Sequence, residues 1–331
     1  MIKIEIPDSS LSRHRAKYYN DIEKILAELK TGKGYLNYTP EKAYFQKFYD
    51  LFIQYDILIA QPEKLKNFII EEEQLVKQCW DGNRPSEVND IFLEIFSYKS
   101  FSEGKYIDSK NKAKDSEWDA WTFLKGLNIS VCPYCNADTV FASIVLKKGK
   151  GAIPIRSALD HYYPKSKYPF LAISLYNLVP SCDRCNSKIK ERREMHNYDT
   201  THPYTDNFHD GIRFSKKILT PGGFCGNPDD FNLELVPTGK DSELITKAGN
   251  MAEFFSIKEV YNSIFKHEAA KIIEKINFCV DSYRSTLKPL GLSDEELDNL
   301  MWGDILDPSQ INRNRLSKMT IDLRNEKIDS V

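Results

Sequence analysis

The chain has 331 residues, a formal net charge of −2, 41% hydrophobic residues and 12% aromatic residues. These values are typical of a soluble globular protein of two or three domains. The sequence contains no apolar run of about 18 residues, which excludes a membrane-spanning helix. Residues 1–7 lack the pattern of a signal peptide. We therefore expect a cytoplasmic protein whose thiols are reduced.

Residues 1–125 predict a mainly helical N-terminal region that contains no catalytic motif. Apolar residues at helical spacing and prolines at first-turn positions predict the helices. They are expected over residues 9–31, over residues 40–59, from Pro62 onward and from Ser86 to Phe96. Residues 99–116 are polar and lysine-rich and predict a linker. Ser116 is expected to cap a helix that contains Trp118 and Trp121.

Two Cys-x-x-Cys pairs lie in the middle of the chain, at Cys132 and Cys135 and at Cys182 and Cys185. Four thiolates form the closed tetrahedral ligand set of a structural zinc site, which leaves no open position for activating water. Two redox dithiols are the alternative reading. The segment between the pairs is longer than in a plain zinc ribbon, so the zinc is expected to clamp the two ends of an inserted substructure.

The segment between and after these pairs predicts two strand pairs and a short helix. The first is a hairpin, with a strand over residues 139–146, a turn at 147–151 and a return from 152. The later elements are a strand over 153–164, a returning strand over 174–180 and a polar helix over 183–193. The order of the later elements is therefore strand, loop, strand, helix.

Three polar residues in this segment point to metal-assisted chemistry. Asp160 offers a carboxylate oxygen, and Asn186 offers an amide oxygen directly after Cys185. Oxygen ligands with room for water suit Mg²⁺ or Mn²⁺ better than zinc. His161 follows the proposed ligand, and its ordinary pKa of about 6.5 suits a general base. A bound divalent cation would stabilise the charge that develops on a phosphate.

The segment from Cys132 to Arg193 resembles the HNH, or His-Me finger, endonuclease family with its ββα-metal fold. The subgroup it resembles carries four zinc cysteines, as phage-type Holliday-junction resolvases do. The resemblance implies a metal-binding Asp160, a general base His161, a loop-pinning Asn177 and an Asn186 at the last motif position. Some members have histidine at that last position, and asparagine is common in the four-cysteine subgroup.

Basic residues are concentrated around this motif. From Leu146 to Arg193 there are eleven Lys or Arg and three Asp or Glu, although the whole chain is slightly acidic. Such a local excess is typical of a nucleic-acid-binding surface, and a solvated surface is the alternative. The candidates for phosphate contacts are Lys165, Lys188 and Arg192.

The remaining sequence predicts a β-hairpin followed by helices. Strands are expected over 231–236 and 244–248, on either side of a turn at 239–241. Helices are expected over 257–287, from Ser293 onward and over 308–323. Three histidines, His196, His202 and His209, would allow a second metal site, but their spacing matches no known ligand set.

The expected fold is therefore α+β, with a zinc-bound ββα-metal nuclease module flanked by mainly helical regions. The expected domains are a helical N-terminal region over 1–125, the nuclease module over 126–200 and a C-terminal region of hairpin and helices over 201–331. The expected function is metal-dependent cleavage of DNA, with structural Zn²⁺ and catalytic Mg²⁺ or Mn²⁺. A restriction-type or junction-resolving nuclease and a non-catalytic zinc module that binds nucleic acid are the alternatives.

The sequence from Asp160 through Lys188 is also similar to effectors of Septu-like and retron-linked phage-defence systems. That resemblance implies a role in antiviral defence beside an ATPase partner protein. The chain itself has no GxxxxGK[ST] loop. Double-stranded DNA is the expected substrate, and cutting both strands with one site per chain favours a homodimer or two successive nicks.

Overall fold

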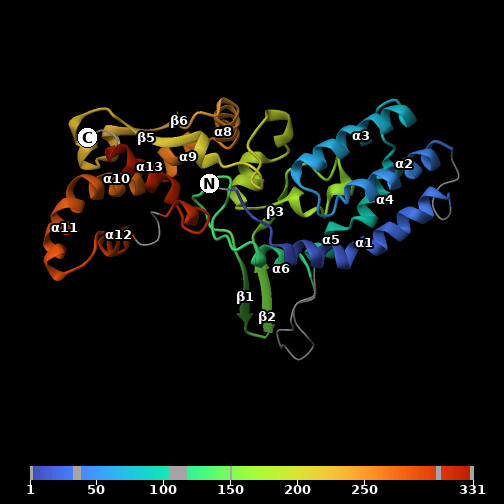
Figure 1. Ribbon diagram of the computed structural model, residues 1–331, viewed down its shortest axis with the longest axis horizontal. Helices are drawn as coiled ribbons and strands as arrows, with labels where there is room; N and C mark the ends of the chain where they lie inside the picture. The colour runs from blue at the N-terminus through green and yellow to red at the C-terminus, as the bar shows by residue number, and fades with distance from the viewer. Residues whose placement is uncertain (1–2, 33–38, 104–117, 150, 303–306, 329–331) are drawn as a thin grey trace. The chain divides into compact units, whose positions relative to one another are not determined.

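The computed structural model describes residues 3–32, 39–103, 118–149, 151–302 and 307–328. It is a mixed α+β structure, mostly helical, with small two-stranded sheets (Figure 1). The expected α+β class is confirmed at this level. Within the described ranges, no helix is both long enough and apolar enough to cross a membrane.

The chain forms two compact units, which are described separately below. The helical unit comprises Glu5–Asn128 and Phe141–Pro180. The cysteine unit comprises Met1–Ile4, Ile129–Val140 and Ser181–Val331. Asp160 and His161 belong to the helical unit, whereas the four knuckle cysteines and Asn186 belong to the cysteine unit.

The helical unit begins with the predicted N-terminal helices. Its helices are α1 (Asp8–Lys30), α2 (Thr39–Tyr55), α3 (Pro62–Trp80), α4 (Ser86–Ile95), α5 (Tyr98–Ser102) and α6 (Ala120–Gly126). Its strands are β1 (Ala142–Lys147), β2 (Gly151–Arg156), β3 (Ala158–His161) and β4 (Leu178–Ser181), the last residue of which lies in the cysteine unit. β1 pairs with β2, and β3 pairs with β4.

Aromatic side chains form the core of the helical unit, as the helical spacing predicts. Phe48, Phe68 and Phe92 from α2, α3 and α4 surround Phe170, with ring centroids 5.3–5.5 Å from it. Such tilted and edge-to-face pairs add to the free energy gained by burying the rings. Phe170 lies between β3 and β4, so the helices hold the connection that follows His161.

A buried ion pair holds the same connection. Arg84 donates to the Glu72 carboxylate at 2.5 Å and to the Lys167 carbonyl at 3.1 Å. Farther along, the amide of Leu175 donates to the carbonyl of Leu58 at 3.0 Å. The N-terminal helices are thus part of the scaffold that carries β3 and β4.

The start of α6 differs from its prediction. The helix begins at Ala120, and the Asp119 side chain accepts from the amide of Thr122 at 2.8 Å. Trp118 therefore precedes the helix. Ser116, the expected cap, lies outside the described residues, as does most of the expected linker, whose beginning is helix α5.

The cysteine unit contains most of the C-terminal half of the chain. Its longer elements are the π-helix η3 (Arg184–Lys190), β5 (Ile212–Ile218), β6 (Phe231–Pro237), α8 (Ser242–Phe254), α9 (Ile257–Ile264), α10 (Lys266–Glu274), α11 (Val280–Leu287), α12 (Asp294–Trp302) and α13 (Ser317–Ile328). Helix η3 lies within the short helix predicted after the second knuckle.

Three predictions for this unit are wrong. β6 forms as expected, but its partner is β5, with Ile218 opposite Phe231, and residues 244–248 lie in α8. Residues 244–248 are helical because the Asp241 side chain caps α8, accepting hydrogen bonds from the amides of Glu243 and Leu244.

The expected long helix over 257–287 is interrupted at Phe265, where φ is −111° and ψ is 15°, and again by a π-helical turn at Lys275–Cys279. The expected helix over 308–323 is a short 3-10 turn, Pro308–Gln310, followed by α13. The spacing of apolar residues does not predict these interruptions, because the apolar face of the predicted helix continues through them.

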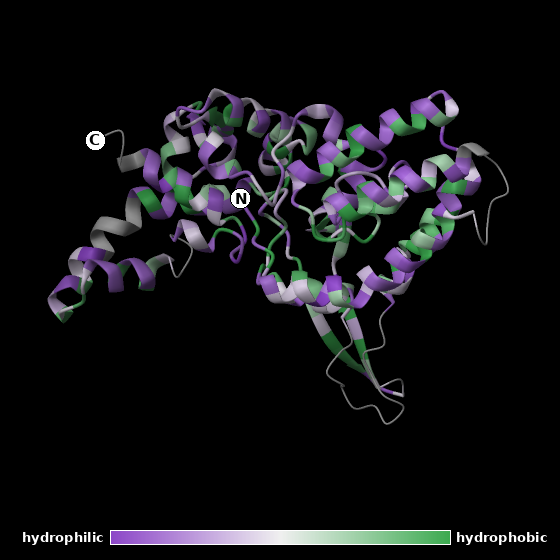
Figure 2. Ribbon diagram, turned by 45° about the vertical axis from the view of Figure 1, so that its right-hand side comes forward, coloured by the Kyte–Doolittle hydropathy of each residue, from purple (hydrophilic) through white to green (hydrophobic). Residues whose placement is uncertain are grey.

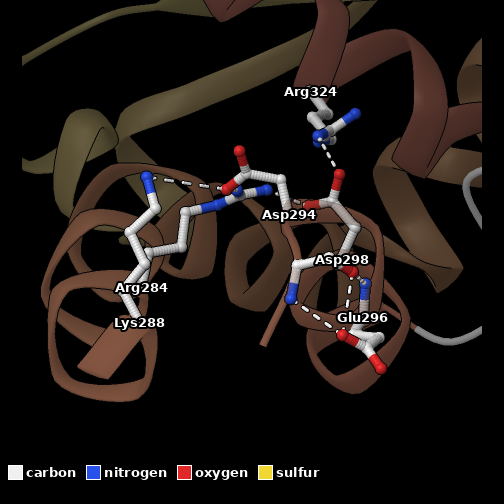
Figure 3. Close-up of polar contacts among 7 residues, drawn as sticks. Arg284, Lys288, Asp294, Glu296, Asp298 and Arg324 are labelled. Carbon is white, nitrogen blue, oxygen red and sulfur yellow. Dashed lines mark hydrogen bonds and ion pairs between the residues drawn. The ribbon is translucent and has the colours of Figure 1, made fainter. Parts of the chain in front are cut away.

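The start of α12 follows the prediction. The Ser293 hydroxyl accepts from the amide of Glu296, and the Glu296 carboxylate accepts from the amide of Ser293 at 2.8 Å, which is a capping box. Arg284 of α11 bonds Asp298 of α12, and Arg324 of α13 bonds the same carboxylate at 3.0 Å (Figure 3). These ion pairs join three helices of the cysteine unit.

Candidate functional site

The four knuckle cysteines form one buried cluster. The sulfur atoms of Cys132, Cys135, Cys182 and Cys185 all lie within 4.8 Å of one another. Those of Cys135 and Cys182 are 3.9 Å apart. Tetrahedral zinc with Zn–S bonds of about 2.3 Å places its sulfurs about 3.8 Å apart. The cluster is therefore consistent with structural Zn²⁺.

Local backbone geometry brings each cysteine pair together. In the first knuckle the amide of Asn136 donates to the Cys132 carbonyl at 2.8 Å, and Asn136 adopts a left-handed conformation with φ of 53°. Asparagine tolerates this conformation better than most residues do. In the second knuckle the amide of Cys185 points at the Cys182 sulfur at 3.4 Å. Both turns present two sulfurs on one side.

The C-terminal segments brace the first knuckle. The buried Asn136 side chain donates to the Ile311 carbonyl at 2.6 Å and accepts from the amide of Lys318 at 3.0 Å. The Tyr261 hydroxyl donates to the Cys135 carbonyl at 2.8 Å. The cluster thus joins residues that are far apart in the sequence.

The electrostatics of the cluster favour a bound cation. Burial raises the pKa of the Cys132 thiol well above its ordinary value. Hydrogen bonds from the neighbouring cysteines, Cys132 first among them, hold the pKa of Cys135 well below it. Arg184 places a guanidinium nitrogen 3.6 Å from the Cys135 sulfur. One arginine offsets little of the charge of four buried thiolates, whereas a divalent cation bonded to all four sulfurs would offset half of it and lower the free-energy cost of burying the rest.

In the helical unit, Asp160 and His161 end strand β3. Asp160 is buried, with 6% of its surface exposed. His161 places Nε2 2.9 Å from the carbonyl oxygen of Ala172. A carbonyl oxygen only accepts hydrogen bonds, so Nε2 carries the proton in this contact. In the neutral ring Nδ1 then carries the lone pair. His161 can therefore take up a proton at Nδ1.

Asn177 holds the connection between β3 and β4. Its side-chain oxygen accepts from the amide of Tyr163 at 2.7 Å, and its nitrogen donates to the carbonyls of Tyr163 and Leu171 at 3.1 and 2.9 Å. The side chain is fully buried. These three bonds are those that a loop-pinning residue requires.

Sequence reasoning missed Tyr98, which contacts the candidate base. The rings of Tyr98 and His161 meet nearly edge to face, with centroids 4.8 Å apart. The ammonium group of Lys165 lies 5.1 Å from the centroid of the Tyr98 ring. The available signal was Ser97, whose side chain accepts from the amide of Ser100 and so starts α5 at Tyr98. That signal predicts the helix but not its contact with His161.

The other candidate residues divide between the units. Lys165 is exposed in the helical unit, and Lys188 and Arg192 are exposed in the cysteine unit. Asn186 is partly buried at the start of η3. The pairing of Asp160 with Asn186 around one catalytic cation therefore stays a prediction.

The candidate second metal site gains no support among the described residues. His202 is buried, and burial lowers its pKa to about 3. Burial also lowers the pKa of His209 to about 3. In the described part of the chain, the group with metal-ligand spacing is that of the four cysteines.

The arrangement thus offers two distinct capabilities. The sulfur cluster can hold a structural cation, and the end of β3 pairs a buried carboxylate with a histidine that can accept a proton. The chain matches no protein-family model, no curated protein and no solved structure.

Proposed function

We propose that the protein is a metal-dependent endonuclease that hydrolyses phosphodiester bonds in double-stranded DNA. The observation that carries the proposal is the end of β3, where buried Asp160 precedes a histidine whose Nδ1 can take a proton. Asn177 makes three hydrogen bonds to the loop that follows these two residues in the sequence. The resemblance of this segment to HNH endonucleases supports the same assignment.

Each residue has one role in the proposed reaction. His161 accepts the proton of a water molecule whose oxygen bonds to phosphorus while the bond to the leaving oxygen breaks. Asp160 and Asn186 are the proposed ligands of Mg²⁺ or Mn²⁺, which neutralises phosphate charge when it is bound. Asn177 positions the loop, and Lys165, Lys188 and Arg192 bind neighbouring phosphates.

The zinc site has a structural role in this proposal. Cys182 and Cys185 begin helix η3, and the amide of Asn186 donates to the Cys182 carbonyl at 3.0 Å. A cation on the four sulfurs thus fixes the backbone of the residue proposed as the second ligand of the catalytic metal. The closed set of four sulfurs leaves the zinc no position for water.

We extend the proposal to phage defence, with an ATPase as the partner protein. The support is the similarity of the segment from Asp160 through Lys188 to defence effectors, and the lack of a Walker-type loop in this chain. A neighbouring ATPase would then supply any nucleotide sensing. Co-purification of the chain with the product of an adjacent ATPase gene tests this extension.

Cleavage of supercoiled plasmid with added Mg²⁺ or Mn²⁺ tests the enzymatic proposal. Asp160→Asn should lower the rate at least about a hundredfold, because it removes the charged ligand of the cation. Asp90→Asn, an exposed carboxylate change in the same unit, should cut as the wild type does. Equal cutting by Asp160→Asn at equal zinc content would refute the assigned metal ligand. Salt-dependent DNA binding without products would favour the non-catalytic zinc module.

A further inference from the structure

The hairpin of β1 and β2 exposes apolar side chains on both of its faces. Leu146, next to the turn, is 83% exposed, and Ile144 precedes it on the same face. Val145 and Ile155 are exposed on the opposite face. Figure 2 shows the two strands extending as a partly hydrophobic ribbon. An exposed apolar surface of this kind usually marks a binding site.

Among the described residues, hydrogen bonds to the rest of the helical unit hold the hairpin at its base. The indole nitrogen of Trp121 in α6 donates to the Ser143 carbonyl at 3.1 Å, and the amide of Phe141 donates to the Ser157 hydroxyl at 3.1 Å. Arg156 donates to the Ser102 hydroxyl at 2.6 Å. The two strands pair at six positions, so the hairpin is about 20 Å long, and four of these pairs lie beyond Ser143.

The charge of the hairpin identifies the kind of partner. Residues 142–156 carry four Lys or Arg and no acidic residue. Lys147 and Lys148 are exposed at the turn beside Leu146. Two copies of this basic hairpin would repel each other, because both carry positive charge. DNA instead offers phosphates that the lysines can bind and base edges that the leucine can contact.

We infer that the β1–β2 hairpin is a DNA-binding arm that enters a groove of the duplex. A two-stranded ribbon fits the major groove. In this arrangement Lys147 and Lys148 contact phosphates, and Leu146 lies against the bases. β2 ends at Arg156 and β3 begins at Ala158, so the arm leads directly to Asp160. The inference rests on the proposed function for its choice of DNA and names a second contact beyond the cleavage site.

Fluorescence anisotropy with a labelled DNA duplex of about three helical turns tests the arm. No divalent cation is added, so binding is measured apart from cleavage. The test variants are Lys147→Gln with Lys148→Gln, and Leu146→Ser. The matched controls are Lys64→Gln with Lys66→Gln, which removes two exposed charges from α3 of the same unit, and Leu290→Ser, an exposed leucine of the cysteine unit.

The double lysine variant should weaken binding at least about tenfold at 0.1 M salt and reduce the slope of log Kd against log salt by about 1.8. Leu146→Ser should weaken binding about tenfold with an unchanged slope, because it removes an apolar contact. Both control variants should bind as the wild type does. All variants should have the melting temperature of the wild type, since the changed side chains are exposed.

Three results would overturn the inference. The first is equal Kd and slope for the two double lysine variants, and the second is a wild type that does not bind the duplex. The third is a Leu146→Ser variant that binds DNA with the wild-type Kd but has a lower oligomeric state than the wild type by light scattering. That result would show that the hairpin contacts a second copy of the chain. The proposed nuclease is judged separately, because hairpin variants that bind normally can still be tested for cutting.

Discussion

The cysteine cluster and the loop after β3 are stabilised in different ways. The cluster brings four sulfurs within 4.8 Å of one another, an arrangement consistent with stabilisation by one structural Zn²⁺. The loop depends on hydrogen bonds from Asn177 and on the packing of Phe170 among helices. Loss of the cation should therefore unfold the cluster as a whole, whereas damage to the loop should be graded. Variants of the two regions should separate these behaviours.

Removing a zinc ligand should have the largest effect. Cys182→Ser should abolish zinc binding and lower the stability of the cysteine unit by about 10 kcal/mol, as expected for structural zinc sites. Elemental analysis should find one zinc per wild-type chain and none in the variant. The control is Cys225→Ser, an exposed cysteine of the same unit that should change neither zinc content nor melting.

Removing the hydrogen bonds that hold the loop after β3 should lower the free energy of unfolding by less and should not change the zinc content. Asn177→Ala removes three hydrogen bonds and leaves buried backbone groups of Tyr163 and Leu171 without that partner. The free energy of unfolding in urea should fall by about 3 kcal/mol. Asn67→Ala, an exposed change on α3, should have little effect. A zinc loss in Asn177→Ala equal to that of Cys182→Ser would contradict the separation of the two regions.

Acid should weaken the helical unit through one buried histidine. His14 accepts a hydrogen bond from Trp118 at 2.9 Å, and burial lowers its pKa to about 3. The unfolded chain protonates this histidine below about pH 6.5, so the stability it contributes at neutral pH is lost as pH falls from 6.5 towards 3. The loss should reach about 2 kcal/mol at pH 5.

His14→Gln should remove that part of the pH dependence and retain an acceptor for Trp118. Urea unfolding at pH 7 and pH 5 measures the change. His267→Gln replaces an exposed histidine and should leave the dependence unaltered. An unchanged pH dependence in His14→Gln would assign the acid sensitivity to other groups.

The smallest effect should come from the cap of α12, which is distant in sequence from the cysteine cluster and from the loop after β3. Ser293→Ala removes the capping box of α12 and should cost about 1 kcal/mol. Zinc content and plasmid cleavage should stay at their wild-type values. Thermal melting and elemental analysis of the same sample measure both outcomes.

The local features of this protein could be predicted from its sequence, and the long-range ones could not. The Cys-x-x-Cys spacing predicted the sulfur cluster because each pair shares one turn and two pairs complete a tetrahedral set. The N-terminal helices and the β1–β2 hairpin followed from periodicity and from the glycines of the turn. The helix start at Ser293 followed from local side-chain chemistry.

One error was local, because the Asp241 cap that starts α8 was not recognised. The other errors arose where tertiary contacts decide the outcome. The partner of β6 is a strand, β5, that no strong alternation marks in the sequence. The contact between Tyr98 and His161 joins residues that local patterns cannot relate. The packing of Phe170 among the N-terminal helices is also invisible to periodicity, although it holds the loop on which the candidate site depends.

The most direct test of the central claim compares plasmid cleavage by the wild type and by His161→Ala at equal zinc content. The account predicts nicked or linear product from the wild type with Mg²⁺ or Mn²⁺, and none from the variant or with EDTA. His267→Ala, which replaces an exposed histidine, should cut normally. Equal cutting by His161→Ala and the wild type would contradict the role of His161 as the general base and, with it, the proposed mechanism.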